Sequence, residues 1–183
     1  REETLAGADN VLITVGISKT DFVIHYRLAG PIENSLNIFV ALGTHRHIGA
    51  AVLPFAQGFE GSTVFLPFKC DLILCAEIRS GQVCCHARTW SHWKWNEREV
   101  TREFDATVSE TGLAFRIPRA ILGDAKEVDF AMYAKDPKAT DGWGWCFGCS
   151  DPPVTAGTGE KNNPHYHRLR LRSRGKTSVS FGG

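Results

Sequence analysis

Apolar side chains recur at every second position along most of this chain, and that period is typical of β-strands. In residues 21–27, for example, Phe22, Ile24 and Tyr26 fall on one face of an extended segment. No stretch keeps the 3.6-residue period of a helix. The helix-like piece is 118–124, where Pro118 can occupy a first helical position and Gly123 can end a single turn.

The alternation defines a series of short candidate strands separated by Gly, Pro, Asn, Asp and Ser. They are 20–30, 36–43, 62–68, 71–79, 82–90, 103–109, 113–118, 128–135 and 165–171. This pattern predicts an all-β fold, an antiparallel two-sheet β-sandwich (jelly-roll-like) with at most one or two short helical turns. We expect residues 1–175 to form a single β-sandwich domain and residues 176–183 to be a last strand or a frayed tail.

The charge pattern excludes some partners. The formal net charge is +1, which argues against nucleic acid as a partner. Arginines occupy every second position from Arg168 to Arg174, which favours a solvated strand face over a phosphate-binding patch. No apolar run approaches the ~20 residues of a membrane-spanning helix, so we expect no membrane span.

Five tryptophans are many for this length, and they suggest a binding surface. On an extended backbone Trp93 and Trp95 share a face, and so do Trp143 and Trp145, which lie among glycines in residues 142–153. Indole rings stack on the apolar faces of sugars, although we expect about two of the five to be core residues. Polar side chains nearby could form hydrogen bonds with the sugar hydroxyls. The predicted carbohydrate-binding residues are therefore Trp93, Trp95, Asp141, Trp143, Trp145, Asn162, Asn163 and Tyr166.

The six cysteines leave three interpretations open: reduced or partly paired structural cysteines, disulfides, or a metal site. Cys146 and Cys149 have zinc-ligand spacing, but a second pair at that spacing is missing. The adjacent Cys84 and Cys85 would point to opposite faces of a strand, and Cys75 reads as a small buried hydrophobe.

Histidines give a second weak metal signal. His45/His47 and His165/His167 would each place two imidazoles on one face of a strand, which could begin a copper or zinc site. Histidines at strand edges more often bind no metal, so we expect no cofactor and keep zinc, copper and haem as alternatives. The candidate ligands are His45, His47, Cys146, Cys149, His165 and His167.

No motif predicts catalysis. The chain has no Gly-x-Ser-x-Gly, no P-loop and no dinucleotide fingerprint, and its carboxylates lie mostly in turns and on charged faces. We therefore expect no catalytic activity in this chain.

Residues 115–133 carry a resemblance to a known group of domains. A strand ending in Ile-Pro (115–118), a turn closing on Leu-Gly (120–123) and a strand of the form V-x-F-A-x-Y (128–133) follow one another. This resembles the β-sandwich accessory domains of α-glucan-active glycosidases and, more distantly, DOMON-like and related carbohydrate-binding modules. The six cysteines and residues 149–167 depart from that pattern.

The resemblance implies a non-catalytic domain that binds a polysaccharide or oligosaccharide, with α-glucan favoured. It also implies a covalently linked catalytic domain in a parent glycosidase. Separately, we expect a secreted or periplasmic location rather than a cytoplasmic one. The alternatives are a metal- or haem-binding β-sandwich, possibly redox-active, and a protein-interaction domain. Haem-binding members of the wider group use Met or His ligands, but Met132, the single methionine, falls in a core-like strand.

Overall fold

A computed structural model of the chain describes ten segments of it. They are residues 12–27, 36–45, 47–52, 65–98, 104–109, 112–135, 143–146, 154–155, 166–171 and 175–180.

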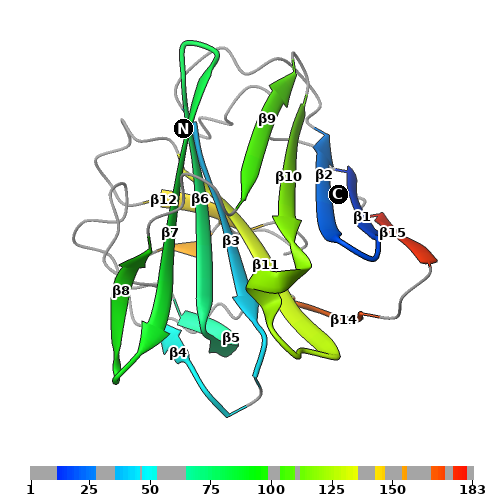
Figure 1. Cartoon of the computed structure of the whole chain (residues 1–183). Helices are drawn as coiled ribbons and strands as arrows, with labels where there is room; N and C mark the ends of the chain where they lie inside the picture. Colours follow the sequence, from blue (N-terminus) through cyan, green and yellow to red (C-terminus); the bar gives the residue numbers. More distant parts are fainter. Residues whose placement is uncertain are drawn as a thin grey trace.

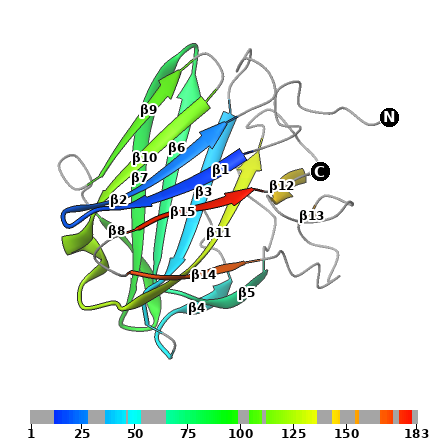
Figure 2. The same ribbon diagram turned by 90° about the vertical axis from the view of Figure 1, so that its right-hand side faces the viewer.

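Two antiparallel sheets form the body of the molecule (Figures 1 and 2). The five-stranded sheet has the order β15 (Gly175–Ser180), β1 (Leu12–Ile17), β2 (Asp21–Arg27), β10 (Gly112–Pro118), β9 (Asp105–Ser109). The larger sheet has the order β13 (Val154–Thr155), β12 (Trp143–Cys146), β11 (Glu127–Lys135), β3 (Leu36–Gly43), β6 (Leu72–Arg79), β7 (Gln82–Ser91), β8 (Lys94–Arg98). An eighth strand, β14 (His167–Arg170), lies outside this order and pairs with β11. A separate hairpin joins β4 (Ala50–Val52) to β5 (Phe65–Cys70).

These sheets confirm the predicted all-β, sandwich-like fold. The helix-like piece 118–124 is also confirmed, because it contains a single 3-10 turn, η1 (Arg119–Leu122). The described residues include no helix long and apolar enough to cross a membrane.

The main hydrophobic core lies between the two sheets. Alternate residues of β2 and β10, such as Phe22, Ile24 and Phe115, pack in one buried cluster with alternate residues of β3 and β6, such as Ile38 and Leu74. Each of these side chains is fully buried, and burial of one such side chain contributes about 1.5–3 kcal/mol to folding. Met132 lies in this core, as its strand pattern predicted.

The outer face of the eight-stranded sheet carries a second, smaller core. Every residue of β3 is buried, because its odd-numbered residues are covered as well as its even-numbered ones. On the outer face Phe39 and Ala41 cluster with Leu66 and Phe68 of β5. The β4–β5 hairpin therefore covers part of this face and leaves the rest for other contacts.

Candidate functional site

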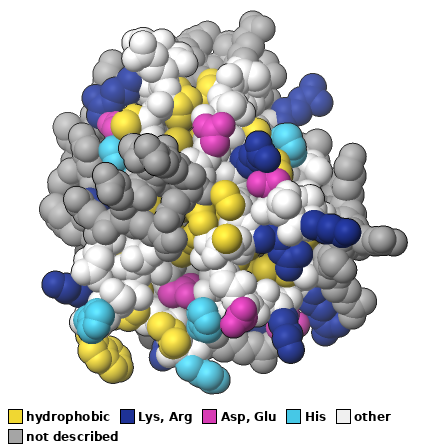
Figure 3. Space-filling model, in the orientation of Figure 1, with side chains coloured by type: hydrophobic (Ala, Val, Ile, Leu, Met, Phe, Trp, Pro, Cys, Tyr) yellow, Lys and Arg dark blue, Asp and Glu magenta, His cyan; other side chains and the backbone are white. Residues whose placement is uncertain are grey.

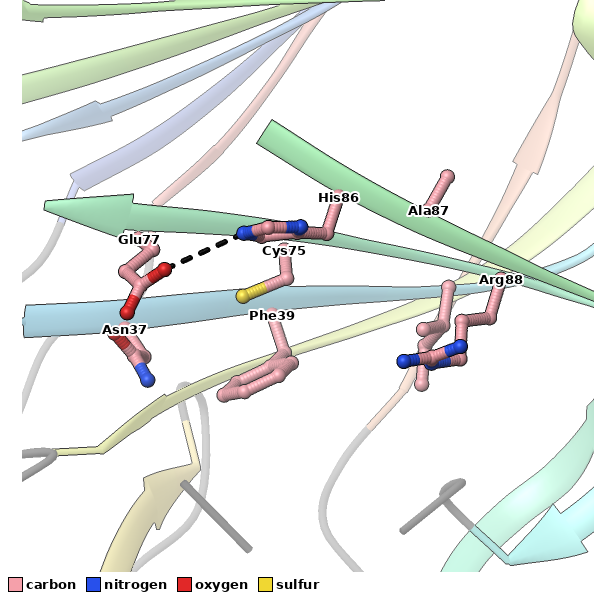
Figure 4. A pocket seen from close by; sticks show the side chains of 8 residues that line it. Asn37, Phe39, Cys75, Glu77, His86, Ala87 and Arg88 are labelled. Carbon is pink, nitrogen blue, oxygen red and sulfur yellow. Dashed lines mark hydrogen bonds and ion pairs between the residues drawn. The ribbon is translucent and has the colours of Figure 1, made fainter. Parts of the chain in front are cut away.

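Three rows of side chains cross the outer face of the eight-stranded sheet. In the middle row Phe39 of β3 lies opposite Cys75 of β6, and Cys75 lies opposite His86 of β7. Directly opposed side chains on neighbouring strands are close enough to contact, and Figure 4 shows these three in succession across the sheet. The register thus assembles side chains that are far apart in the sequence.

A pocket opens over these rows. On one side of the middle row the register places Asn37 opposite Glu77, and on the other side it places Ile73 opposite Arg88. The hollow spans about 440 Å³, a figure that includes the space open to solvent, so it is a shallow depression in the sheet face. It is lined by Asn37, Phe39, Ile73, Cys75, Glu77, His86, Ala87 and Arg88.

Glu77 is held as an ionised carboxylate between two partners. Arg79 Nε donates a hydrogen bond to Glu77 Oε1 at 2.7 Å, and His86 Nε2 lies 3.3 Å from Glu77 Oε2. Burial acts to raise the pKa of Glu77, but the hydrogen bonds with Arg79 and His86 outweigh it and leave that pKa below its ordinary value. Glu77 therefore orients the imidazole and presents negative charge at the pocket (Figure 4).

Asn37 is the pocket residue with an unmet hydrogen-bonding need. The residue is 1% exposed, and its side-chain Oδ1 atom has no hydrogen-bond partner among the described residues. A buried acceptor without a partner costs about 1–3 kcal/mol, and such groups are rare in folded proteins. A ligand that donates a hydrogen bond to Oδ1 would remove this cost.

Aromatic side chains flank the pocket along β7 and β8. The rings of Trp90 and Trp95 meet edge to face, with their centroids 5.5 Å apart and their planes at 74°. Trp95 packs against the second core, and its Nε1–H donates to Val52 O at 3.2 Å. This bond ties the aromatic pair to the β4–β5 hairpin.

The prediction that Trp93 and Trp95 share a strand face is wrong. Trp93 lies in the turn between β7 and β8 with φ +63° and is 90% exposed, whereas Trp95 is a partly buried residue of β8. The physical reason is that a tight hairpin turn needs two residues with positive φ, and here His92 and Trp93 supply them.

The other predicted sugar contacts fall in three places. Tyr166 is partly exposed, and its ring lies 5.4 Å from that of Phe68. The backbone of residues 143–146 forms strand β12, which pairs with β11 and β13. The side chains of Trp143 and Trp145, and the whole of Asp141, Asn162 and Asn163, lie outside the described residues.

The predicted strand placement of His45 and His47 is wrong. Strand β3 ends at Gly43, and the chain then turns because Asp71 Oδ1 accepts a hydrogen bond from Thr44 N at 2.7 Å. His45 Nδ1 lies 3.1 Å from Asp71 Oδ2, and His47 is exposed beyond the turn. Among the described residues no group of three or more His, Cys, Asp or Glu could hold a metal ion.

The remaining predicted metal ligands are not described at side-chain level. His167 begins β14 and Cys146 ends β12, but the structure describes only the backbone of each. Cys149 and His165 lie outside the described residues.

Sequence reasoning missed the pocket residues Asn37, Glu77, His86 and Arg88 as a group. The alternation along each strand could have placed each of them on the outer face. Only the strand order β3–β6–β7 and its register bring them together.

The four described cysteines form no disulfide with one another, and they differ in their accessibility. Cys84 is exposed, whereas Cys85 packs against the main core, which confirms that the two point to opposite faces. Burial raises the pKa of Cys85 to about 11 and raises the pKa values of Cys70 and Cys75 further. Cys75, read from the sequence as a small buried hydrophobe, is 9% exposed.

Among the four cysteines whose side chains are described, we expect iodoacetamide to modify Cys84 of the native protein first at pH 8. The reactive form is the thiolate, and a raised pKa means that a thiol ionises only at higher pH, so Cys85 should react more slowly and Cys70 and Cys75 last. Peptide mapping by mass spectrometry at successive times measures this order. Urea should equalise the four rates, and a native Cys75 that reacts as fast as Cys84 would contradict the burial described above.

No protein-family model, no curated protein and no solved structure matches this chain.

Proposed function

We propose that the outer face of the eight-stranded sheet binds a carbohydrate and that this chain is a non-catalytic binding domain. The observation that carries the proposal is the buried Oδ1 atom of Asn37, a residue that lines the open pocket; this atom has no hydrogen-bond partner in the part of the chain that the structure describes. A sugar hydroxyl is a small neutral donor that would satisfy this atom.

The chemistry of the pocket suits a polyhydroxylated ligand. Asn37 and Glu77 offer acceptors, while the guanidinium of Arg88 offers donors. The Trp90–Trp95 pair on the same face is half-buried, so it supplies apolar surface on which the C–H face of a sugar ring can pack. The pocket lining includes both an acidic side chain, Glu77, and a basic one, Arg88, and this mixture favours a neutral ligand over a polyanion.

The pocket is poorly equipped for hydrolysis. Glycoside hydrolysis generally uses two carboxylates that flank the scissile bond, and Glu77 is the one carboxylate among the residues that line the pocket. Cys75 lies beside His86, but burial raises the pKa of its thiol and so disfavours the nucleophilic thiolate. Binding without catalysis is the simpler use of these residues.

The finer parts of the proposal come from the sequence resemblance. It favours an α-glucan as ligand and a linked glycosidase catalytic domain in the parent protein. A secreted or periplasmic location is a separate part of the proposal. Trp143, Trp145, Asp141, Asn162, Asn163 and Tyr166 remain predicted contacts to the same ligand. The alternatives, a metal- or haem-binding domain and a protein-interaction domain, are tested by elemental analysis with an absorption spectrum and by pull-down.

The Asn37→Leu variant is expected to bind maltoheptaose or glycogen about tenfold more weakly, as a lost hydrogen bond of about 1–1.5 kcal/mol implies. Its free energy of unfolding should stay the same or rise, because leucine has a similar shape and removes the unpaired acceptor. Affinity-gel electrophoresis and calorimetry measure binding, and urea denaturation measures stability.

A matched control is His25→Ala, which changes an exposed residue of β2 in the opposite sheet. This variant should bind like the wild type. The proposal is contradicted if the wild type binds no glycan on an array. It is also contradicted if Asn37→Leu lowers stability but leaves glycan affinity unchanged.

A further inference from the structure

Two turns at one end of the sandwich expose large hydrophobic side chains. Trp93, between β7 and β8, is 90% exposed, and Ile48, between β3 and β4, is 53% exposed. Both turns lie at the lower end of the molecule in Figures 1 and 2. In Figure 3 histidine and hydrophobic side chains occur together along the same lower rim.

The backbone conformation at Trp93 is one that a tryptophan adopts only with strain, so the turn itself does not require a tryptophan at this position. The β6–β7 turn uses Ser80 (φ +50°) and Gly81 (φ +77°), and glycine is a common residue at such a positive-φ position of a two-residue hairpin turn. The β7–β8 turn has the same pair of positive φ values at His92 (φ +53°) and Trp93 (φ +63°). Glycine would fit the second position without strain, so an exposed tryptophan there is unfavourable for the fold.

The turn holds Trp93 firmly in spite of that strain. Asn96 Nδ2 donates to Ser91 O at 3.1 Å and to Lys94 O at 3.0 Å, on the two sides of the turn. A turn braced in this way presents the indole in a fixed position, and this reduces the entropy lost when the ring enters another phase or contacts a partner.

The titratable side chains in the two turns and directly beside them are histidines and lysines. Among the side chains described at 44–45, 47–49 and 91–96, none is a carboxylate. These segments carry His45, His47, His92 and Lys94, and Lys69 Nζ lies beside them, donating to His47 O at 3.4 Å. The carboxylate behind this rim, Asp71, is already bonded to Thr44 and His45.

We propose that this end of the sandwich, the tip surface formed by Ile48, Trp93, Lys69 and Lys94, docks on an anionic phospholipid surface. Indole rings favour the interfacial layer of a bilayer, since one edge is polar and the body is apolar. Lysines beside them gain from the negative potential of acidic lipids. The tip surface lies outside the pocket on the outer sheet face, so this proposal does not depend on glycan binding.

The test is co-sedimentation of the whole chain with vesicles of phosphatidylcholine, with and without phosphatidylserine, at low and high salt. The wild type should bind the phosphatidylserine vesicles, and salt should weaken the binding. Trp93→Gly should reduce binding roughly tenfold through loss of buried indole area, while its urea midpoint stays the same or rises. Lys94→Glu should reduce binding at least about fivefold on phosphatidylserine vesicles only.

Tyr166→Ala serves as the matched control, because Tyr166 is another exposed aromatic residue but directly precedes β14 and belongs to neither turn. It should leave vesicle binding unchanged. The proposal is overturned if the wild type does not bind anionic vesicles, or if Trp93→Gly binds them as well as the wild type. It is also overturned if Trp93→Gly loses glycan binding alone, which would assign Trp93 to the carbohydrate surface.

Discussion

Gly49→Ala is expected to lower the free energy of unfolding by about 3 kcal/mol or more, through a strained backbone and a steric clash together. Gly49 has φ +122°, a conformation that residues with a side chain rarely adopt. A Cβ atom there would lie 2.4 Å from the backbone oxygen of Cys70 and 2.6 Å from its carbonyl carbon. Because those atoms belong to paired strand β5, they cannot move aside cheaply.

Urea denaturation measures this effect, and Gly81→Ala is the matched control. Gly81 also has a positive φ (+77°), but a Cβ atom there would meet no atom within 4 Å. The control should therefore show the conformational cost alone, about 1 kcal/mol. Equal losses in the two variants would mean that the close approach of Gly49 to β5 is not a constraint on the fold.

This clash also bears on the site. The strands that follow Gly49 form the β4–β5 hairpin, which covers the second core and accepts the hydrogen bond from Trp95 at Val52 O. A displaced hairpin would release Trp95 and with it the edge-to-face contact to Trp90. We therefore expect Gly49→Ala to weaken glycan binding beyond the loss of folded protein.

Much of the fold could be predicted from the sequence because a half-buried strand must alternate. Phe22, Ile24 and Tyr26 are buried as the period indicates, and the buried Leu169 and Leu171 alternate with the exposed Arg168 and Arg170. The strands that alternation did not identify include β1, β4, β12 and β13. β4, β12 and β13 have four residues or fewer, so each depends on a partner strand for its backbone hydrogen bonds.

The pocket could not be predicted because it depends on which strands are neighbours. Asn37 reads as one polar residue in an apolar strand, and Glu77 and His86 read as ordinary surface residues. Their chemistry arises when β6 lies between β3 and β7 in one register. A shift of one residue in that register would send these side chains to the other face. Local patterns do not contain this information.

Arg168→Ala is expected to lower the free energy of unfolding by about 2–3 kcal/mol, because it leaves a buried carboxylate without its partner. Arg168 Nε and Nη2 donate to the two oxygens of Asp129 at 2.7 and 2.9 Å. Asp129 is 8% exposed, so water cannot replace the lost guanidinium fully. The hydrogen bonds with Asp129 raise the pKa of Arg168, so the guanidinium stays charged. The pair also fixes β14 against β11, where Arg168 lies over the ring of Tyr166.

Arg170→Ala is the matched control for this prediction, because Arg170 lies two residues further along β14 and pairs with Glu127 of the same partner strand. That pair is more exposed, with 65% of the arginine side chain and 29% of the glutamate side chain accessible, so its loss should cost less than about 1 kcal/mol. Urea denaturation of both variants measures the difference.

A double variant, Arg168→Met with Asp129→Leu, should recover most of the stability, since it removes both charges together. If Arg168→Ala and Arg170→Ala cost the same, or if the double variant is less stable than Arg168→Ala, burial of Asp129 is not the source of the effect.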